Sequence, residues 1–516
     1  MFPILSIITF LPFVGGIAIL FIPKKQVAVI RWSAFAVACV DLFQVLGLIL
    51  AYSQANVSTT SPVVGNAPNS AFLFNEQLSW IPSVGINYSL GVDGISLLLV
   101  ALTTLLSLVC IAASFRVEQK AKNYMAFMLL LESGIIGVFL STNLFLFYIF
   151  WEVMLIPAYF LVGSWGGERR IYAAFKFVLY TSLGSLLMLA GIIALGYFHW
   201  KTSGGSYTLD LAALLNSKLD NTAQLWLFLA FGAAFVVKIP FVPFHSWLPD
   251  AYSEAPAAVT AMLAGAMSKT GAYGFLRICL PLFPSAAHTL APLINSLAVA
   301  SILYCALLAL VQTDLKRLLG YSSISHLGVI MLGMFAFNTQ GIEGSVLQMV
   351  NHGITTAALF LIVGYIEVRT GTRNINDFGG LAKRVPILAT VTLIAVLSSL
   401  GLPGLNNFAG EFLALLGAFR SSPLFGVLGT AVVVPAAWYL IRFFLRVMEG
   451  PLQTEGPVAS LERRGMLPDL HFAEFLTLSP LLVLIFFIGI QPAPLTYLME
   501  PSVVNTLQNL GIALIH

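Results

Sequence analysis

A few ionisable side chains stand inside apolar stretches long enough to cross a membrane. A charge at the centre of a bilayer costs about 2.5–3.5 kcal/mol on the insertion scale, so such residues are predicted to carry function. Side chains that bind and release protons could pass them from helix to helix, although a structural ion pair remains the alternative for any single residue. The residues are Asp41, Glu132, Glu152, Lys238, Lys269 and Glu411, with His326 and His352 at similar depth.

Two of these residues lie where a helix cannot continue regularly. Lys238 stands in the stretch 236–250, VVKIPFVPFHSWLPD, whose three prolines remove backbone hydrogen-bond donors. Glu411 ends the stretch 401–411, GLPGLNNFAGE, which is rich in glycine, proline and asparagine. Irregular backbone at membrane depth is tolerated where it is buried or lines a watery cavity. Broken helices that carry an ionisable residue are typical of transporter sites, so both stretches are predicted to form one.

The spacing of these residues indicates an internal repeat. Glu152 and Lys238 are 86 residues apart, and His326 and Glu411 are 85 residues apart. His326 lies 174 residues after Glu152, and Glu411 lies 173 residues after Lys238. Each of the two units would contain five helices. Because five is odd, the second copy would cross the membrane in the opposite direction. The pattern therefore predicts two inverted five-helix repeats.

Three other ionisable residues permit more than one interpretation. His245 follows the first predicted break, beside Asp250 and Glu254. It is predicted either to receive protons from water or to be a loop histidine that caps a backbone carbonyl. Asp41 is expected to hold helices together rather than to carry protons. Glu132 either extends the polar path or pairs with a neighbouring subunit.

Residues that would hold a metal or a redox group are scarce. The four cysteines lie far apart in apolar stretches without a CxxC pair, so they are predicted to be buried thiols. The segment 264–270, AGAMSKT, resembles a phosphate loop but has Ser268 in place of the glycine before the lysine. We expect no cofactor or metal bound by this chain. The net charge of +3 is small and dispersed, so nucleic acid is not an expected partner.

The composition shows what must position these residues. The chain has 516 residues, of which 59% are apolar and 9% are charged, and its mean hydropathy is +0.92. A soluble chain carries about 25% charged residues, so this one is predicted to be an all-α polytopic membrane protein. Its apolar runs predict about fourteen transmembrane helices, with the seventh and twelfth broken, at 3–22, 28–52, 94–114, 123–140, 142–164, 171–198, 224–244, 257–280, 288–312, 317–338, 343–368, 386–419, 423–447 and 473–490.

The basic residues predict how the chain is oriented. Loops after odd-numbered spans, with their flanking helix turns, hold 19 of the 25 lysines and arginines. Loops rich in basic residues face the cytoplasm, so these loops are predicted to be cytoplasmic and both termini to be periplasmic. The opposite face has four, Lys201, Lys218, Arg277 and Arg420, and Lys238 and Lys269 lie within the membrane. The 19 are Lys24, Lys25, Arg31, Arg116, Lys120, Lys122, Arg169, Arg170, Lys176, Lys316, Arg317, Arg369, Arg373, Lys383, Arg384, Arg442, Arg446, Arg463 and Arg464.

These spans predict four parts of the chain. Residues 1–122 would hold the first three helices, and residues 123–280 the first five-helix repeat. Residues 288–447 would form the second, inverted repeat, and residues 448–516 a loop, the last helix and a tail. No connection is long enough for a separate soluble domain.

Five stretches of the sequence resemble the antiporter-like membrane subunits of respiratory complex I. The stretches are FWEVMLIP at 150–157, KIPFVPFHSWLPDA at 238–251, KTGAYGFLR at 269–277, DLKRLLGYSSISHLG at 314–328 and GEF at 410–412. The resemblance extends over essentially the whole chain. It implies fourteen helices with two inverted five-helix repeats, which agrees with the count made from hydropathy.

Within that family, one position favours the subunit M type, called subunit 4 in mitochondria. Subunits L and N, and the related Mrp antiporters, generally have a lysine on the second broken helix, where this chain has Glu411. The chain is also expected to end soon after its last span, without the long lateral helix of subunit L. The cyanobacterial and chloroplast homologues share these motifs and differ mainly in their electron donor.

The resemblance implies a role in a larger enzyme, NADH(or ferredoxin):quinone oxidoreductase. Its partners would be the L-, N-, K-, J-, A- and H-type membrane subunits, the peripheral redox arm and lipid. NAD(P)H or ferredoxin, FMN, iron–sulfur clusters and quinone would be bound by partner subunits. The chain would lie in the bacterial inner membrane, or in the thylakoid membrane if it is cyanobacterial.

The resemblance also implies a proton pathway. Protons would enter from the cytoplasm near the first broken helix, reside on Lys238, pass through Lys269 and His326, and leave from Glu411. The switch would be a Glu152–Lys238 ion pair, worth roughly 4 kcal/mol at about 4 Å and an effective dielectric near 20. Three further residues are predicted to belong to the pathway, Lys176 and His352 as flanking members and His245 where protons enter.

Two other functions are weighed against this one. A Mrp-type Na⁺/H⁺ antiporter subunit would exchange one ion gradient for another, but Glu411 and the lack of an obvious sodium site disfavour it. A structural spacer would anchor a larger complex without conducting protons. Lysines at the level of the membrane centre disfavour that alternative, because a purely structural core is usually as stable with apolar residues.

Overall fold

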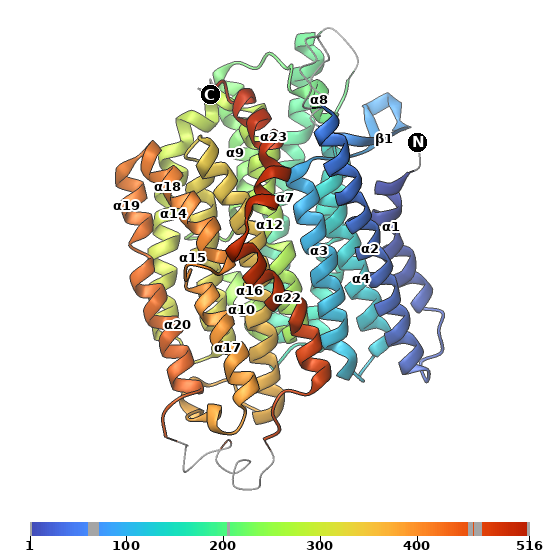
Figure 1. Ribbon diagram of the computed structural model, residues 1–516. Coiled ribbons are helices and arrows are strands. Elements are labelled where there is room, and N and C mark those ends of the chain that lie inside the picture. Colours follow the sequence, from blue (N-terminus) through green and yellow to red (C-terminus); the bar gives the residue numbers. More distant parts are fainter. Residues whose placement is uncertain (1–2, 60–71, 204–206, 452–457, 459–466, 513–516) are drawn as a thin grey trace.

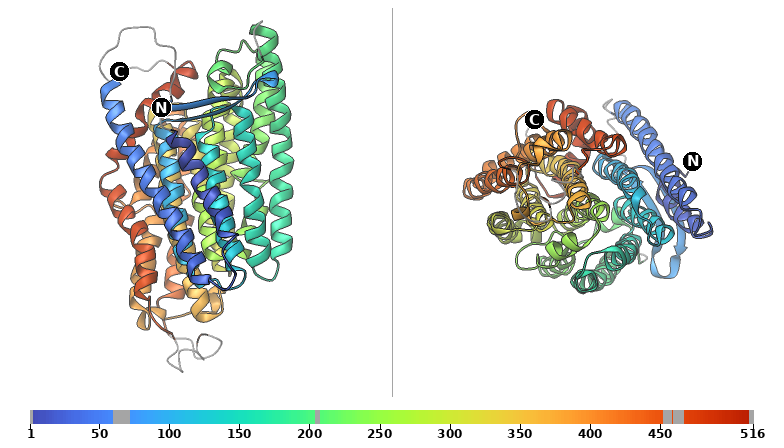
Figure 2. Two further views of the ribbon diagram at one scale, coloured as in Figure 1. Left: turned by 90° about the vertical axis from the view of Figure 1, so that its right-hand side faces the viewer. Right: turned by 90° about the horizontal axis from the view of Figure 1, so that it is seen from below.

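The structure is a computed structural model, and it describes residues 3–59, 72–203, 207–451, 458 and 467–512. The described chain forms a tall bundle of helices (Figures 1 and 2). Among the described residues, ten helices are long and apolar enough to cross a membrane. The prediction of an all-α membrane protein is thus confirmed, apart from one small hairpin. Arg463 and Arg464, which are predicted to lie on the cytoplasmic side, are outside the described residues.

The first half of the chain holds thirteen α-helices within the described residues. They are α1 (Ile4–Ile19), α2 (Val27–Thr59), α3 (Gly94–Ala113), α4 (Ala121–Leu140), α5 (Leu144–Val153), α6 (Leu155–Trp165), α7 (Arg170–Ser203), α8 (Leu211–Leu214), α9 (Asn221–Lys238), α10 (Trp247–Glu254), α11 (Ala257–Met262), α12 (Lys269–Gly274) and α13 (Leu280–Leu282).

The second half continues the bundle with further α-helices. They are α14 (Pro284–Val311), α15 (Leu315–Met334), α16 (Thr339–Thr370), α17 (Pro386–Ser399), α18 (Asn406–Ser421), α19 (Pro423–Thr430), α20 (Val433–Val447), α22 (Phe472–Ile490) and α23 (Ala493–Asn509). The most apolar window of α16 is wholly buried, so this helix forms part of the core. Helix α23 was not predicted, because residues 493–509 were taken as a tail.

The two ends of the bundle differ in charge. Helix α1 begins and α23 ends at the same end, which we call the terminal end (Figure 1). The opposite end holds Arg31 near the start of α2, Arg116 just after α3, and Arg373 just after α16. We call it the basic end. This distribution is what the positive-inside pattern of the sequence leads one to expect.

A two-stranded hairpin lies across the terminal end. Strands β1 (Leu73–Ile81) and β2 (Ile86–Val92) pair in antiparallel fashion. The Glu76 carboxylate accepts hydrogen bonds from the backbone N–H groups of Leu5 and Ser6, so the hairpin supplies the N-terminal cap that α1 lacks. Asn87 of β2 donates to Asp210 at 2.7 Å, which ties the hairpin to the segment before α8.

The first predicted break is present between α9 and α10. Helix α9 ends at Lys238, and α10 begins at Trp247. The indole N–H of Trp247 donates to the carbonyl of Val237 at 3.0 Å, and the Ser301 hydroxyl accepts from the backbone N–H of Val242 at 3.0 Å. Side chains thereby satisfy backbone groups that the prolines leave without helical partners.

The second predicted break is present between α17 and α18. Gly401 and Gly404 adopt φ angles of 77° and 93°, a left-handed conformation that glycine favours. Asn406, the first residue of α18, exchanges hydrogen bonds with Asn351 of α16: each side-chain amide donates to the backbone carbonyl of the other, at 2.7 and 3.1 Å. The hydroxyl of Ser398 donates to the side-chain oxygen of Asn406 at 2.6 Å. The break is therefore held against the buried helix α16.

Candidate functional site

A row of ionisable side chains runs from α12 of the first half into the core of the second half. The Lys269 ammonium donates to Nδ1 of His352 at 2.8 Å. The ring centres of His352 and His326 lie 5.5 Å apart, and Nδ1 of His326 is 2.6 Å from Oε1 of Glu411. Lys269 is 0% exposed, His352 1% and His326 6%, so the row is enclosed by protein until it reaches Glu411.

Four different helices position this row. Lys269 begins α12, His352 lies midway along α16, His326 lies on α15 and Glu411 lies on α18 just after the break. On the sequence alone, the path ran directly from Lys269 to His326, and His352 was a flanking member. The structure instead places the His352 ring between those two side chains.

Sequence reasoning missed one polar side chain of this row. Gln348 is fully buried, and its amide donates to Oε1 of Glu411 at 2.9 Å. It precedes His352 by four residues on α16, so the two side chains share one face of that helix. That spacing is the signal from which Gln348 could have been found.

The helix segment around Lys269 has an unusual backbone. Wide π-helical turns at Leu263–Met267 and Phe275–Cys279 flank α12. The Lys269 ammonium donates to the carbonyl of Ala264 at 2.5 Å and to the Ser268 hydroxyl at 3.2 Å. Such turns often occur at functional sites, because they leave carbonyl groups outside the regular hydrogen-bond ladder.

Lys238 lies at the first break and stands apart from this row. It is 1% exposed, and its ammonium nitrogen lies 5.4 Å from the ring centre of Trp151 and 5.5 Å from that of Phe177. Within the described part of the chain, the nitrogen has no hydrogen-bond partner. The expected Glu152–Lys238 ion pair is not formed, and no carboxylate among the described residues contacts this ammonium. Two aromatic rings face the ammonium instead, and Glu152 lies half-buried near the end of α5.

Lys176 belongs to a different cluster from the one predicted. Its ammonium donates to the Asp250 carboxylate at 2.8 Å and to the carbonyl of Ser246 at 2.9 Å, near the basic end. Arg317 binds the other Asp250 oxygen at 2.7 Å. This cluster pins α10 to α7 and α15. His245, half-buried beside the rings of Tyr304 and Tyr321, lies within the break, next to Ser246, whose carbonyl binds Lys176.

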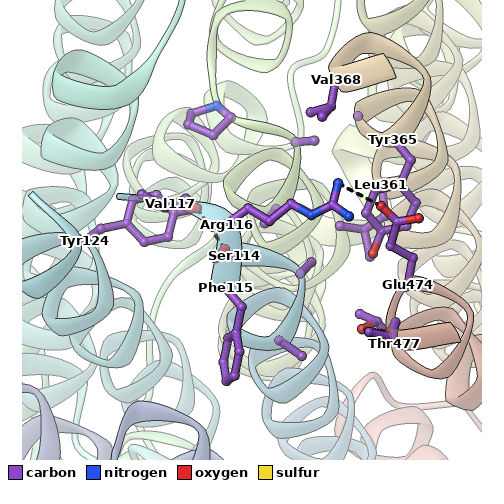
Figure 3. Close-up of a pocket in the computed structure, with 17 residues that line it drawn as sticks. Ser114, Phe115, Arg116, Val117, Tyr124, Leu361, Tyr365, Val368, Glu474 and Thr477 are labelled. Carbon is purple, nitrogen blue, oxygen red and sulfur yellow. Dashed lines mark hydrogen bonds and ion pairs between the residues drawn. The ribbon is translucent and has the colours of Figure 1, made fainter. Parts of the chain in front are cut away.

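A cavity of about 330 Å³ opens near the basic end, between α3, α4, α16 and α22. Figure 3 shows the Arg116 side chain reaching across it toward Glu474, at 3.1 Å. Glu474 is also bound by Arg369, and it accepts from the backbone N–H of His471 at 3.0 Å. The walls are mostly apolar, and none of the residues predicted for the proton pathway lines the cavity.

The described residues contain no group of three or more histidine, cysteine, aspartate or glutamate side chains that could hold a metal ion.

A buried ion pair was also missed by sequence reasoning: Arg277 binds Asp93 at 2.5 Å, with side-chain exposures of 9% and 0%. These two residues lie 184 positions apart, so no local pattern reveals them.

Comparisons with known proteins agree with this architecture. The family model described as NADH:quinone oxidoreductase/Mrp antiporter, transmembrane, matches residues 141–434. Subunit M of NADH-quinone oxidoreductase from Rickettsia bellii is 38% identical over 508 residues, which are 98% of each chain. The corresponding subunit from Pseudomonas aeruginosa is 39% identical over 518 residues, 99% of each chain.

A solved structure matches over the same length. A chain of respiratory complex I from Thermus thermophilus with bound NADH superimposes with a TM-score of 0.84 and 30% identity. The match covers 98% of this chain and 99% of that one. Together with the two broken helices and the buried row of lysine, histidine and glutamate, these similarities show that the chain belongs to the subunit M family of NADH-quinone oxidoreductase, the antiporter-like membrane subunits of respiratory complex I.

Proposed function

We propose that protons cross this chain along its buried ionisable side chains, from the first broken helix to the second. As a member of the subunit M family, the chain is a proton-pumping membrane-arm subunit of NADH:quinone oxidoreductase. The observation that carries the proposed route is the row from Lys269 through His352 and His326 to Glu411, with polar contacts of 2.8 and 2.6 Å at its two ends.

The chemistry of the row suits proton transfer. Lysine, histidine and glutamate can each bind and release a proton. The two histidine rings stand between an ammonium and a carboxylate, so a proton leaving Lys269 has acceptors on the way to Glu411. Intervening water molecules would bridge the two rings, whose centres lie 5.5 Å apart.

The first half supplies the other members of the route. Lys238 holds the proton at the first break. The α12 segment packs directly on it at Gly271, where even an added Cβ would come within 3.1 Å of the Cβ of Lys238. Protons enter from the basic end near His245, where Lys176 and Asp250 form their cluster. The Glu152 carboxylate acts on the Lys238 ammonium electrostatically from a distance rather than through a direct ion pair.

The proposed frame is fourteen transmembrane helices with two inverted five-helix repeats, 123–280 and 288–447. Ten helices qualify by length and hydropathy, and the interrupted or shorter helices α1, α11–α13, α15 and α17–α18 would supply the other four crossings. Both chain termini would then face the periplasm or lumen, and the basic end would face the cytoplasm. Residues 1–122 and 448–516 would flank the two repeats.

The energy for pumping comes from partner subunits in this proposal. Quinone reduction in the rest of the complex would rearrange charge along the neighbouring L-, N-, K-, J-, A- and H-type membrane subunits and so reach this chain. The electron donor, NAD(P)H or ferredoxin, and the FMN, iron–sulfur clusters and quinone would be bound by those partners. The membrane would be the bacterial inner membrane, or the thylakoid membrane in a cyanobacterium.

The substitution Glu152→Gln tests this function in the assembled complex. It keeps the size of the side chain but removes its charge, so we expect the rate of proton-coupled quinone reduction to fall strongly. Quinone reduction and proton uptake would be measured in sealed vesicles, with Glu168→Gln at an exposed position as the matched control. A near-normal rate together with a near-normal number of protons per electron would contradict the proposal.

A further inference from the structure

Two carboxyl groups face each other inside the membrane-spanning part of the bundle, away from the proposed route. Asp41 lies on α2 and Glu132 on α4, and both are 0% exposed. Helices α2, α3 and α4 pack side by side (Figures 1 and 2). The two carboxyl groups lie within hydrogen-bonding reach of one another.

The hydrogen bonds around this pair lack a donor. The Ser107 hydroxyl of α3 donates to Oε2 of Glu132 at 2.6 Å. Both oxygens of Asp41, and Oε1 of Glu132, are buried and receive no hydrogen bond from any other described residue. Ionised carboxylate oxygens can only accept, so two ionised groups cannot bond to each other. A contact between them requires a hydrogen atom on one of the two.

No cation compensates the pair. Among the described residues of α1 to α4, the basic side chains are Arg31 and Lys122. Arg31 donates to the carbonyl of Val117, and Lys122 donates to the carbonyls of Leu20 and Ile22, all near the basic end. Two other elements that pack on α4 carry charged side chains, Glu152 on α5 and Lys269 on α12, and neither forms an ion pair with Asp41 or Glu132.

Two unpaired negative charges at this place would be costly. Moving an ionised carboxylate out of water without a partner costs several kcal/mol even after the protein relaxes, so such groups neutralise. Two carboxyl groups in contact can hold one proton between them, because that proton removes one charge and supplies the missing donor. The acid O–H of one group then donates to an oxygen of the other.

We propose that Asp41 and Glu132 form a proton-binding site, separate from the Lys238–Glu411 route, that retains one shared proton at neutral pH. The site binds its proton from water and releases it as a proton, with no other bond formed or broken. The ligand is a proton rather than a metal ion, because the Ser107 hydroxyl, which donates to Glu132 alone, is the one further polar group bonded to the pair among the described residues, and no third acidic, histidine or cysteine group lies within the described surroundings.

Infrared spectroscopy of the purified, assembled complex tests this site. A protonated carboxyl group has its own carbonyl stretch, which shifts when the sample is transferred to D₂O. We expect part of that signal to be lost in the variant D41N/E132Q. In S107A, where the hydroxyl donor is absent, the signal should move but persist. E118Q, at an exposed acid near the start of α4, is the matched control and should leave the signal unchanged.

The double variant should still assemble, because an amide facing an amide supplies both donors and acceptors. Native gel electrophoresis and the single variant D41N check this, since the asparagine N–H donates to the remaining carboxylate.

If D41N/E132Q assembles and loses no protonated-carboxyl signal, both acids are ionised and the proposal is wrong. The proposal is equally wrong if NaCl, but not choline chloride, abolishes the signal of the unsubstituted complex, because a sodium ion then occupies the pair. Neither outcome depends on the proposed route, whose test is the coupled rate of the Glu152 variant.

Discussion

Replacement of Lys238 by methionine tests the proposed route at its most isolated charge. The side chain is 1% exposed, and its ammonium faces the rings of Trp151 and Phe177 without a hydrogen-bond partner among the described residues. Methionine is unbranched and flexible, so it fills the same space and still contacts the rings. The variant thus removes the proton-binding group while it leaves the packing at the break largely unchanged.

The structure indicates a small effect on folding and a large effect on turnover. Each desolvated cation–π contact is worth about 2 kcal/mol, whereas a lysine charge at the membrane centre costs about 2.5–3.5 kcal/mol. These contributions nearly cancel, so K238M should assemble. A positioned acid–base group accelerates proton transfer by about 10²–10⁴-fold. We therefore expect the proton-coupled quinone reductase rate to fall by at least about 100-fold, which corresponds to about 2.7 kcal/mol of barrier.

The assay compares membranes that contain unsubstituted chain, K238M, K238R and K218M. Lys218 is exposed, so K218M controls for the loss of a lysine as such. Arginine keeps the positive charge but does not release its proton in proteins, so K238R should fail like K238M if proton transfer is the role of Lys238. Oxidation of the electron donor by an artificial acceptor reports whether the peripheral arm is intact. An assembled K238M complex with a near-normal quinone reductase rate and proton yield would refute the reasoning.

Three further substitutions give distinct outcomes. Glu411→Lys replaces the group that contacts His326 at 2.6 Å, so the number of protons moved per electron should decrease more than the amount of assembled complex; failure to assemble would favour a structural role. Asn406→Ala removes the side-chain hydrogen bonds that join the second break to Asn351 of α16 and to Ser398 of α17, and it should lower the thermal midpoint of the complex by leaving buried partners unsatisfied, at about 1–3 kcal/mol each. Glu474→Gln removes the charge that binds Arg369 beside the basic-end cavity, and a loss of about 3–5 kcal/mol of stability is expected on chemical denaturation; an unchanged midpoint would contradict it.

Hydropathy and helix-breaking residues predicted much of this fold. Apolar runs located the helices, and the prolines and glycines near Lys238 and Glu411 located both breaks, because these features depend on local chemistry. The hairpin was missed because long-range contacts hold it, such as Glu76 with the start of α1. The π-helical turns were missed as well. Their residues have the same apolar pattern as an ordinary helix, and only packing distinguishes the two.

The site was predictable in its residue types but not in its order of contacts. An ionisable side chain inside an apolar run is conspicuous, whereas its partner depends on how the helices pack. Spacing could not show that His352 lies between Lys269 and His326, nor that aromatic rings rather than Glu152 surround the Lys238 ammonium. Buried pairs such as Arg277 with Asp93 are formed by segments distant in sequence, and each residue alone resembles a loop charge.

The two wide turns beside Lys269 have a consequence for the length of this segment. Each turn accommodates one residue more than a regular helical turn, so the stretch from 257 to 282 holds two extra residues over the same rise. Deletion of a residue from the regular helix α11, ahead of the first wide turn, would rotate everything beyond it by about 100° about the helix axis. Arg277 would then turn away from Asp93, and the path would lose alignment at Lys269. This short segment should consequently tolerate substitutions far better than any change in the number of its residues.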